Sequence, residues 1–162
     1  MAYKVKGTCA DVSFVVLGPI ENNVYFVTDG ASTIVVDPSC EPDVIMSALG
    51  GRKLDAIVLT HRHFDHVGAA AELRRRTGAT VIASSIDADT IEGKKPVSRM
   101  ERPFEPCPVD HRVNHGDVLK IGNMPWKVIM TPGHTEGSMC LFLDPQFGDH
   151  PEAKPVLIAG DT

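Results

Sequence analysis

The sequence predicts an α/β domain in which helices flank a mixed β-sheet. Short β-branched runs separated by turn residues fill much of the first 37 residues, which is typical of antiparallel strands. A continuous apolar run then follows a helical pattern, as expected for a buried strand. The 162 residues are 43% hydrophobic and 23% charged, which suits a soluble domain with its own core. No linker or repeat divides them, so we expect one domain over residues 1–162.

The first three strands form a predicted antiparallel meander. They are apolar and β-branched, and they occupy residues 12–18, 23–28 and 32–37. A polar cluster separates the first two strands. Asp29-Gly30, between the second and third strands, is a strong hairpin signal.

A helix and a buried strand are predicted next. Pro42 suits the first helical turn, apolar residues recur on one face through 44–49, and Gly50-Gly51 ends the helix. Residues 54–59 are apolar except for Asp55, which predicts a buried strand. The end of this strand leads directly into a cluster of histidines.

Helices, strands and loops alternate through the rest of the chain. We expect a helix at 66–77, a strand at 79–83 and a short helix at 85–92. The Pro-rich, charged segment at 93–108 predicts a surface loop. The pattern does not decide whether this loop covers a functional site. The remaining predictions are strands at 117–121, 126–130, 138–143 and 156–158, and a polar loop at 144–154.

Charge and composition argue against a nucleic-acid or membrane partner. The formal net charge is -5, and the one basic run, Arg74-Arg75-Arg76, ends a predicted helix, where cations suit the helix dipole. No apolar run approaches the roughly 20 residues of a membrane span, and residues 1–11 are too polar for a signal-peptide core. We therefore expect a cytoplasmic protein with a small-molecule substrate. The four widely spaced cysteines predict reduced thiols.

The segment T-H-x-H-x-D-H, which begins at the end of the buried strand, is the strongest functional signal. It holds four side chains that suit a zinc-like ion: His61, His63, Asp65 and His66. Imidazoles one residue apart can point the same way from extended backbone, so His61 and His63 can bind one ion. Asp65 and His66 follow as the chain enters a helix, and they can turn toward a second ion.

Two more candidate ligands follow strands farther along the chain. His134 lies in the turn T-P-G-H-T after the strand at 126–130, and Asp161 lies in A-G-D-T after the strand at 156–158. Three strand ends would thus bring ligands to one edge of a sheet, where open sheets commonly place their sites. The other histidines lack such a context, and we expect them to be ordinary polar residues: His111, His115 and His150.

With these motifs, the chain resembles the metallo-β-lactamase-fold hydrolases, particularly the small glyoxalase II-like members, from about Ser13 to the last residue. The resemblance implies that His61, His63 and His134 hold a first metal ion. It implies that Asp65, His66 and Asp161 hold a second ion, with Asp161 bridging the two. It also implies that Asp37, in Val35-Val36-Asp37-Pro38, braces the metal loops as a hydrogen-bond acceptor behind the ligands.

The resemblance implies a hydrolase with two divalent metal ions, for which zinc is favoured and iron and manganese stay open. A metal-bound hydroxide would attack a thioester or ester carbonyl, and Asp65 would orient this nucleophile and later accept its proton. A different enzyme class, the mononuclear iron persulfide dioxygenases, uses a similar motif and stays open. A true β-lactamase is disfavoured by the missing export signal. A nuclease is disfavoured by the acidic charge, and a flavodiiron protein by a histidine, His63, where that branch has glutamate.

The resemblance covers only the N-terminal half of the family's αββα sandwich. The family's later strands and its last metal-ligating histidine have no counterpart up to the A-G-D-T motif. We therefore expect a truncated domain, or a second chain that supplies the missing half, with a homo-oligomer covering the exposed sheet face. A third expectation is a half domain that is inactive alone.

Overall fold

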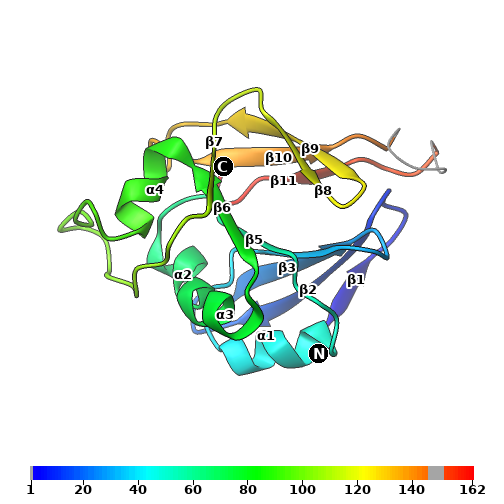
Figure 1. Ribbon diagram of the computed structural model, residues 1–162, viewed down its shortest axis with the longest axis horizontal. Coiled ribbons are helices and arrows are strands. Elements are labelled where there is room, and N and C mark those ends of the chain that lie inside the picture. The colour runs from blue at the N-terminus through cyan, green and yellow to red at the C-terminus, as the bar shows by residue number, and fades with distance from the viewer. Residues whose placement is uncertain (1, 146–151) are drawn as a thin grey trace.

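Two β-sheets pack face to face in this computed structural model, and helices cover the outer face of the larger sheet (Figure 1). The structure describes residues 2–145 and 152–162. The larger sheet has seven strands in the order β1 to β7, antiparallel from β1 to β4 and parallel from β4 to β7. The smaller sheet is antiparallel, in the order β11-β10-β9-β8.

The bounds of the elements follow, sheet by sheet. The larger sheet contains β1 (Tyr3–Val5), β2 (Asp11–Leu17), β3 (Asn22–Thr28), β4 (Thr33–Val36), β5 (Ala56–Val58), β6 (Thr80–Ser84) and β7 (His111–Val113). The smaller sheet contains β8 (Val118–Ile121), β9 (Met124–Met130), β10 (Met139–Leu143) and β11 (Val156–Ile158). The helices are α1 (Pro42–Leu49), α2 (Phe64–Val67), α3 (Ala70–Thr77) and α4 (Ser85–Ile91).

Each face of the larger sheet buries its own hydrophobic core. On the helix side, Ile45 and Leu49 of α1 and Leu73 of α3 are almost fully buried against the strands. On the other side, Trp126 and Leu141 of the smaller sheet are fully buried against the larger one. The predicted α/β class with a large mixed sheet and flanking helices is therefore confirmed.

The predicted helix at 66–77 is wrong in one respect, because the chain forms two helices, α2 and α3, with a break at Gly68 and Ala69. The Ala69 amide donates a 2.9 Å hydrogen bond to the carbonyl of Pro38 and so leaves the helical ladder. A Cβ added at Gly68 would lie 2.2 Å from the carbonyl oxygen of Ser39. The segment after β4 thus presses against the chain just beyond the histidine cluster, and this contact breaks the helix.

Gly68→Ala is expected to destabilise the protein, although alanine favours a helix over glycine in most contexts. The new methyl group would overlap the Ser39 carbonyl, so we expect a loss of about 1–3 kcal/mol in the free energy of unfolding. Urea unfolding of the metal-free protein measures it. Gly133→Ala is the control, because its Cβ would meet no atom within 4 Å. Equal stability of the two variants would contradict the steric account.

Two strands were not predicted from the sequence, and one predicted strand is shorter than expected. β1 is a three-residue edge strand that is exposed at every residue, and β7 is short and mostly polar, so neither stands out as an apolar run. The strand expected at 54–59 forms only over β5. The predicted polar loop at 144–154 falls largely outside the described residues.

One end of the inner face of the larger sheet is open to solvent. Tyr3, Val5 and Val16 point to the same side as Val12, which belongs to the core between the sheets. These three side chains are nevertheless 51%, 41% and 42% exposed. The smaller sheet therefore leaves the β1–β2 end uncovered, and the homo-oligomer that would cover it stays a prediction.

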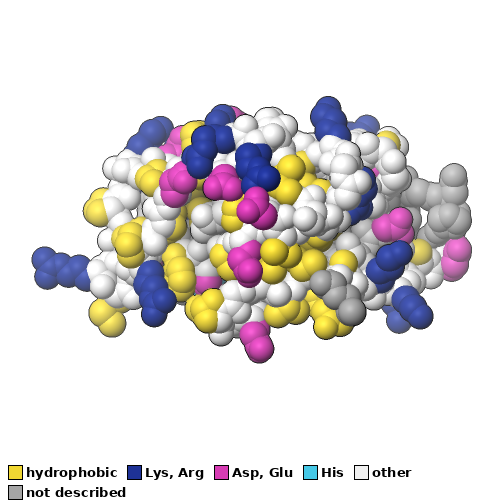
Figure 2. Space-filling model, turned by 90° about the horizontal axis from the view of Figure 1, so that it is seen from below, with side chains coloured by type: hydrophobic (Ala, Val, Ile, Leu, Met, Phe, Trp, Pro, Cys, Tyr) yellow, Lys and Arg dark blue, Asp and Glu magenta, His cyan; other side chains and the backbone are white. Residues whose placement is uncertain are grey.

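The basic run at the end of α3 is engaged in ion pairs. Arg74 pairs with Asp110 and Arg75 with Glu105, and Arg76 lies within ion-pair distance of carboxylates on α1 and α3. Seen from the helix side, acidic and basic side chains are intermixed (Figure 2). None of the described helices is both long and apolar enough to span a membrane.

The thiol of Cys107 is expected to resist alkylation in the folded protein. Burial raises its pKa to about 11, so near pH 8 its thiolate fraction is about 100-fold below that of an ordinary thiol. Iodoacetamide labelling followed by peptide mass spectrometry should modify the partly exposed Cys40 well before Cys107. Labelling at equal rates without denaturant would contradict the buried position of Cys107.

Candidate metal centre

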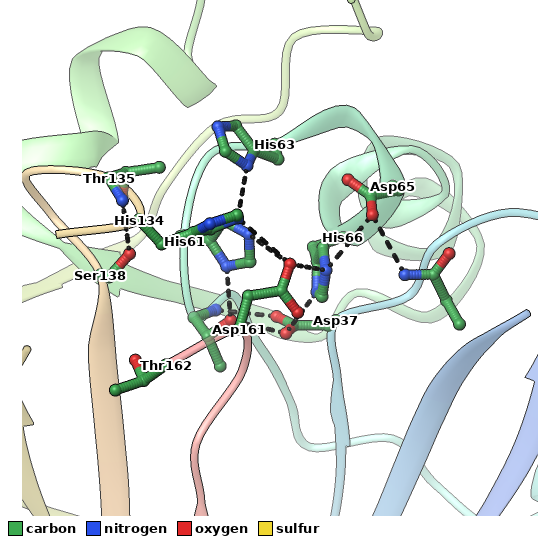
Figure 3. A network of polar contacts seen from close by, with 12 residues as sticks. Asp37, His61, His63, Asp65, His66, His134, Thr135, Ser138, Asp161 and Thr162 are labelled. Carbon is green, nitrogen blue, oxygen red and sulfur yellow. Dashed lines mark hydrogen bonds and ion pairs between the residues drawn. The ribbon is translucent and has the colours of Figure 1, made fainter. Parts of the chain in front are cut away.

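Ligand-competent side chains from both sheets meet at one end of the sandwich, as Figure 3 shows. The larger sheet contributes the segment after β5, which runs into α2 and carries four of these residues. The smaller sheet contributes the segments after β9 and β11. All six residues predicted to bind metal come together here: His61, His63, Asp65, His66, His134 and Asp161.

Three histidines form the first group. One ring nitrogen each of His61, His63 and His134 lies within 4.8 Å of the others. Nδ1 of His63 and Nε2 of His134 are 2.9 Å apart. His61 is buried, whereas His134 is exposed, so the group runs from the interior to the surface.

Two carboxylates and a histidine form the second group. Ligand atoms of Asp65, His66 and Asp161 also lie within 4.8 Å of one another. Oδ2 of Asp161 is 3.1 Å from Nε2 of His66 and 3.1 Å from Nε2 of His134. Because one carboxylate oxygen contacts a histidine of each group, Asp161 connects the two.

Asp37 holds the segment that carries the histidines. It lies after β4 with a left-handed backbone (φ 52°), and its carboxylate is buried. It accepts hydrogen bonds from the Thr60 amide at 2.8 Å and the Thr60 hydroxyl at 2.6 Å. It also lies 2.8 Å from Nδ1 of His66. A single acceptor thus fixes both the start of the cluster and one of its rings.

The hydrogen bonds of Thr60 determine which nitrogen of His61 carries the proton. The Thr60 hydroxyl donates its only hydrogen to Asp37, so it must accept from Nδ1 of His61, which is 2.9 Å away. Nε2 of His61 is then a bare lone pair. This atom is buried and has no hydrogen-bond partner among the described residues.

Burial and nearby charges shift the pKa values of the two buried histidines, His61 and His66, in opposite directions. Burial lowers the pKa of His61 to about 4, although Asp37 opposes this effect, so the ring is neutral near pH 7. Burial alone would also lower the pKa of His66. The hydrogen bond to Asp37 and the nearby carboxylates outweigh it and raise that pKa to about 9. His66 therefore lies where positive charge is favoured.

The donor set fits divalent cations. Nε2 of His61 and Oδ2 of Asp161 are 3.6 Å apart, and both can only accept a hydrogen bond when His61 is neutral with its proton on Nδ1. Two such atoms facing each other are stabilised by a cation between them. Imidazole nitrogens and carboxylate oxygens are the ligands that zinc, iron and manganese share.

The site opens into a cavity of 630 Å³, whose lining includes Asp37, Asp65, His66 and Asp161. A second cavity of 430 Å³ is lined in part by Phe64 and Arg102. Asp65 borders both, and its carboxylate accepts a 3.2 Å hydrogen bond from Asn22. A small molecule could therefore reach this carboxylate.

Several residues that contact the ligands or their neighbours carry no sequence motif. Asn22, from the polar cluster predicted between the first two strands, donates to Asp65. Asp87 accepts from Thr135, next to His134, and Glu101 lies 3.4 Å from Nε2 of His63. Of the histidines expected to be ordinary, His111 begins the edge strand β7, and His115 accepts a hydrogen bond from the Met130 amide. The third, His150, lies outside the described residues.

Comparison with known protein sequences identifies one family. Residues 17–162 match the model of the metallo-beta-lactamase superfamily. A hydroxyacylglutathione hydrolase of Nitrobacter winogradskyi is 33% identical over 155 residues, which are 96% of this chain and 49% of that protein. Another from Bradyrhizobium sp. is 36% identical over 118 residues, 71% of this chain and 40% of that protein. The chain thus spans less than half the length of these two relatives.

A solved structure supports the fold. The subclass B3 metallo-beta-lactamase of Bradyrhizobium japonicum superposes with a TM-score of 0.77 over 96% of this chain and 61% of that chain. The sequences are 24% identical, so this likeness concerns the fold alone.

Proposed function

The chain belongs to the metallo-β-lactamase superfamily, and from that premise we propose that it carries the metal centre of a thioester or ester hydrolase. The observation that supports this most directly is Nε2 of His61. This buried atom carries a lone pair, has no hydrogen-bond partner in the described part of the chain, and lies 3.6 Å from a carboxylate oxygen of Asp161. Buried polar atoms are rarely left unpaired, and a divalent ion between these two atoms would satisfy both.

The two groups of ligands suit two ions. In this proposal His61, His63 and His134 would hold the first ion, Asp65 and His66 would hold the second, and Asp161 would contribute to both. Asp37 fixes the rings of His61 and His66 from behind, directly or through Thr60. Three imidazoles in the first group favour zinc, although iron and manganese accept the same ligands.

When bound, such ions supply Lewis acidity, which activates a water molecule and polarises a carbonyl group. The chain's own residues would do the rest. Asp65 borders both cavities, so its Oδ1 would be able to orient the attacking water and accept its proton. Asn22 donates to the other oxygen of Asp65 and keeps that carboxylate in place.

The leaving group decides which bond can break. A thiolate can depart without prior protonation, because its parent thiol has a pKa of about 8.5. An amine leaving group needs a general acid. The residues grouped at the site offer carboxylates and metal-facing imidazoles, and none is placed as a dedicated acid. A thioester, or an activated ester, is therefore the favoured substrate class. The relatives named hydroxyacylglutathione hydrolase point the same way.

Hydrolysis of matched substrates tests the proposal. Zinc-loaded protein should release thiol from an acyl thioester, should cleave the corresponding oxygen ester more slowly, and should leave the amide intact. Asp65→Asn should lower kcat by about 10²- to 10⁴-fold, because the amide side chain accepts no proton. The fold of this variant is checked by its unfolding curve. Amide cleavage at a comparable rate, or full activity without this carboxylate, would contradict the mechanism.

One observation favours a second candidate, a mononuclear iron dioxygenase acting on a persulfide. Oδ2 of Asp161 lies 3.1 Å from Nε2 of His134 and 3.6 Å from Nε2 of His61. Two histidines and one carboxylate around a common point are also the ligand set of non-haem Fe(II) oxygenases. Elemental analysis of the purified protein and oxygen uptake with a persulfide separate the two candidates. One iron per chain with oxygen consumption would favour the dioxygenase.

A further inference from the structure

A buried carboxylate connects the two segments that carry His63 and His134. Asp87, in the first turn of α4, is 1% exposed. It accepts hydrogen bonds from the Arg62 amide at 3.1 Å and the Arg62 guanidinium at 3.0 Å. It also accepts one from the Thr135 hydroxyl at 2.7 Å. Because Arg62 precedes one histidine and Thr135 follows the other, Asp87 sets the spacing between them.

The second of these segments is packed tightly onto Asp87. A Cβ added at Gly137 would lie 2.5 Å from Cγ of Asp87. The Gly137 carbonyl accepts a 2.8 Å hydrogen bond from Ser84, whose hydroxyl also caps α4. The segment carrying His134 therefore has little freedom to move away from the segment carrying His63.

Arg62 extends this network to a residue of the surface loop at 93–108. Its guanidinium donates to both carboxylate oxygens of Glu101, at 3.3 and 3.0 Å. Both side chains are mostly buried, Arg62 at 15% and Glu101 at 16% exposure. Burial would raise the pKa of Glu101, but the hydrogen bonds and charge of Arg62 outweigh it and lower that pKa, so the side chain is a carboxylate at neutral pH.

Glu101 in turn faces the ring of His63. Its Oε1 lies 3.4 Å from Nε2, while Nδ1 of the same ring faces His134 at 2.9 Å. A carboxylate only accepts hydrogen bonds, so the nitrogen beside it is favoured to carry the proton. A neutral imidazole has one N–H, and its other nitrogen, Nδ1, is then a lone pair directed into the three-histidine group.

We propose that Glu101 is a positioning residue for the metal centre, which keeps His63 in the Nε2–H form so that Nδ1 can bind the ion. Arg62 and Asp87 hold Glu101 and the two histidine segments in this arrangement. The inference rests on the metal centre proposed above, and it adds that the loop at 93–108 contributes to metal affinity. Partners of this kind typically change metal affinity by about 10- to 100-fold.

Zinc competition with a chromophoric chelator tests the effect on affinity. Glu101→Ala should weaken zinc binding at the three-histidine group by about 10- to 100-fold, and it should change the visible absorption spectrum of the Co²⁺-loaded protein. Glu101→Gln should fall between Glu101→Ala and the wild type, because its amide oxygen can still accept from Nε2. Glu105→Ala is the matched control, since Glu105 lies in the same loop but pairs with Arg75 at the surface.

A second measurement does not depend on metal. Long-range ¹H–¹⁵N spectra of the metal-free protein near pH 8 report which nitrogen of His63 is protonated. The Nε2–H form is expected in the wild type and in Glu105→Ala, and a shift toward Nδ1–H is expected in Glu101→Ala.

An Nδ1–H ring in the wild type, or unchanged zinc affinity and Co²⁺ spectrum in Glu101→Ala, would overturn the inference. If Glu101→Ala does not fold, Glu101→Gln and the wild-type spectrum decide it. A wild-type protein that binds zinc but hydrolyses no thioester would contradict the proposed reaction alone, and the role of Glu101 would stand.

Discussion

Asp161→Ala should weaken zinc binding by more than about 100-fold at both groups of ligands. This effect is larger than that of removing a residue that only hydrogen-bonds to a ligand. One oxygen of this carboxylate lies within 3.6 Å of Nε2 of His61, His66 and His134. Its removal takes a negative charge from both groups at once. Zinc competition with a chelator, together with native mass spectrometry, measures the affinity and the number of ions bound.

His63→Ala provides the comparison for Asp161→Ala. His63 belongs only to the three-histidine group, so its loss should weaken one ion and leave the other in place. Asp161→Asn keeps the size and one oxygen, and it should retain more affinity than the alanine variant. If Asp161→Ala and His63→Ala had the same effect, a bridging carboxylate would be contradicted.

Asp37→Ala should destabilise even the metal-free protein, by about 3–5 kcal/mol in the free energy of unfolding. Its carboxylate is buried, and it is the acceptor for the Thr60 amide, the Thr60 hydroxyl and Nδ1 of His66. Alanine would leave all three donors buried without this acceptor. Alanine also tolerates the left-handed backbone at this position poorly. Urea unfolding in the presence of a chelator isolates this effect from metal binding.

Two further variants define what Asp37 contributes. Asp37→Asn tolerates the left-handed backbone and keeps one acceptor, so its stability should lie between those of alanine and the wild type. Asp43→Ala is the surface control, because Asp43 is 90% exposed and pairs with the surface residue Arg76. It should change stability little. Equal stability of Asp37→Ala and Asp43→Ala would contradict the assigned role of Asp37.

Elements with strong local patterns were predictable from the sequence. The hairpin at Asp29-Gly30 joins β3 and β4, and the apolar run after α1 forms the buried strand β5. The failures have tertiary causes. β1 is an exposed edge strand of only three residues, and β7 is equally short and mostly polar, so neither gives a clear strand signal. The break at Gly68 depends on a contact with Ser39, which no local pattern encodes.

The same distinction applies to the site. Ligand candidates such as His61 and His134 stand in short motifs at strand ends, and so the sequence could indicate that they would meet. Their supports do not share such motifs. Asp87 lies 25 residues from Arg62 and 48 from Thr135, and Glu101 lies 39 residues from Arg62. Only the packing of α4 and the loop at 93–108 against the histidine segments brings these groups together.

Native mass spectrometry of the wild-type chain during zinc titration tests the central claim most directly. The geometry predicts two ions per chain at saturation, with the three-histidine group and the Asp65–His66–Asp161 group each holding one. His63→Ala should then lose one ion and retain the other. Saturation of the wild type at one ion per chain, or at none, would contradict a centre in which Asp161 joins two metal sites.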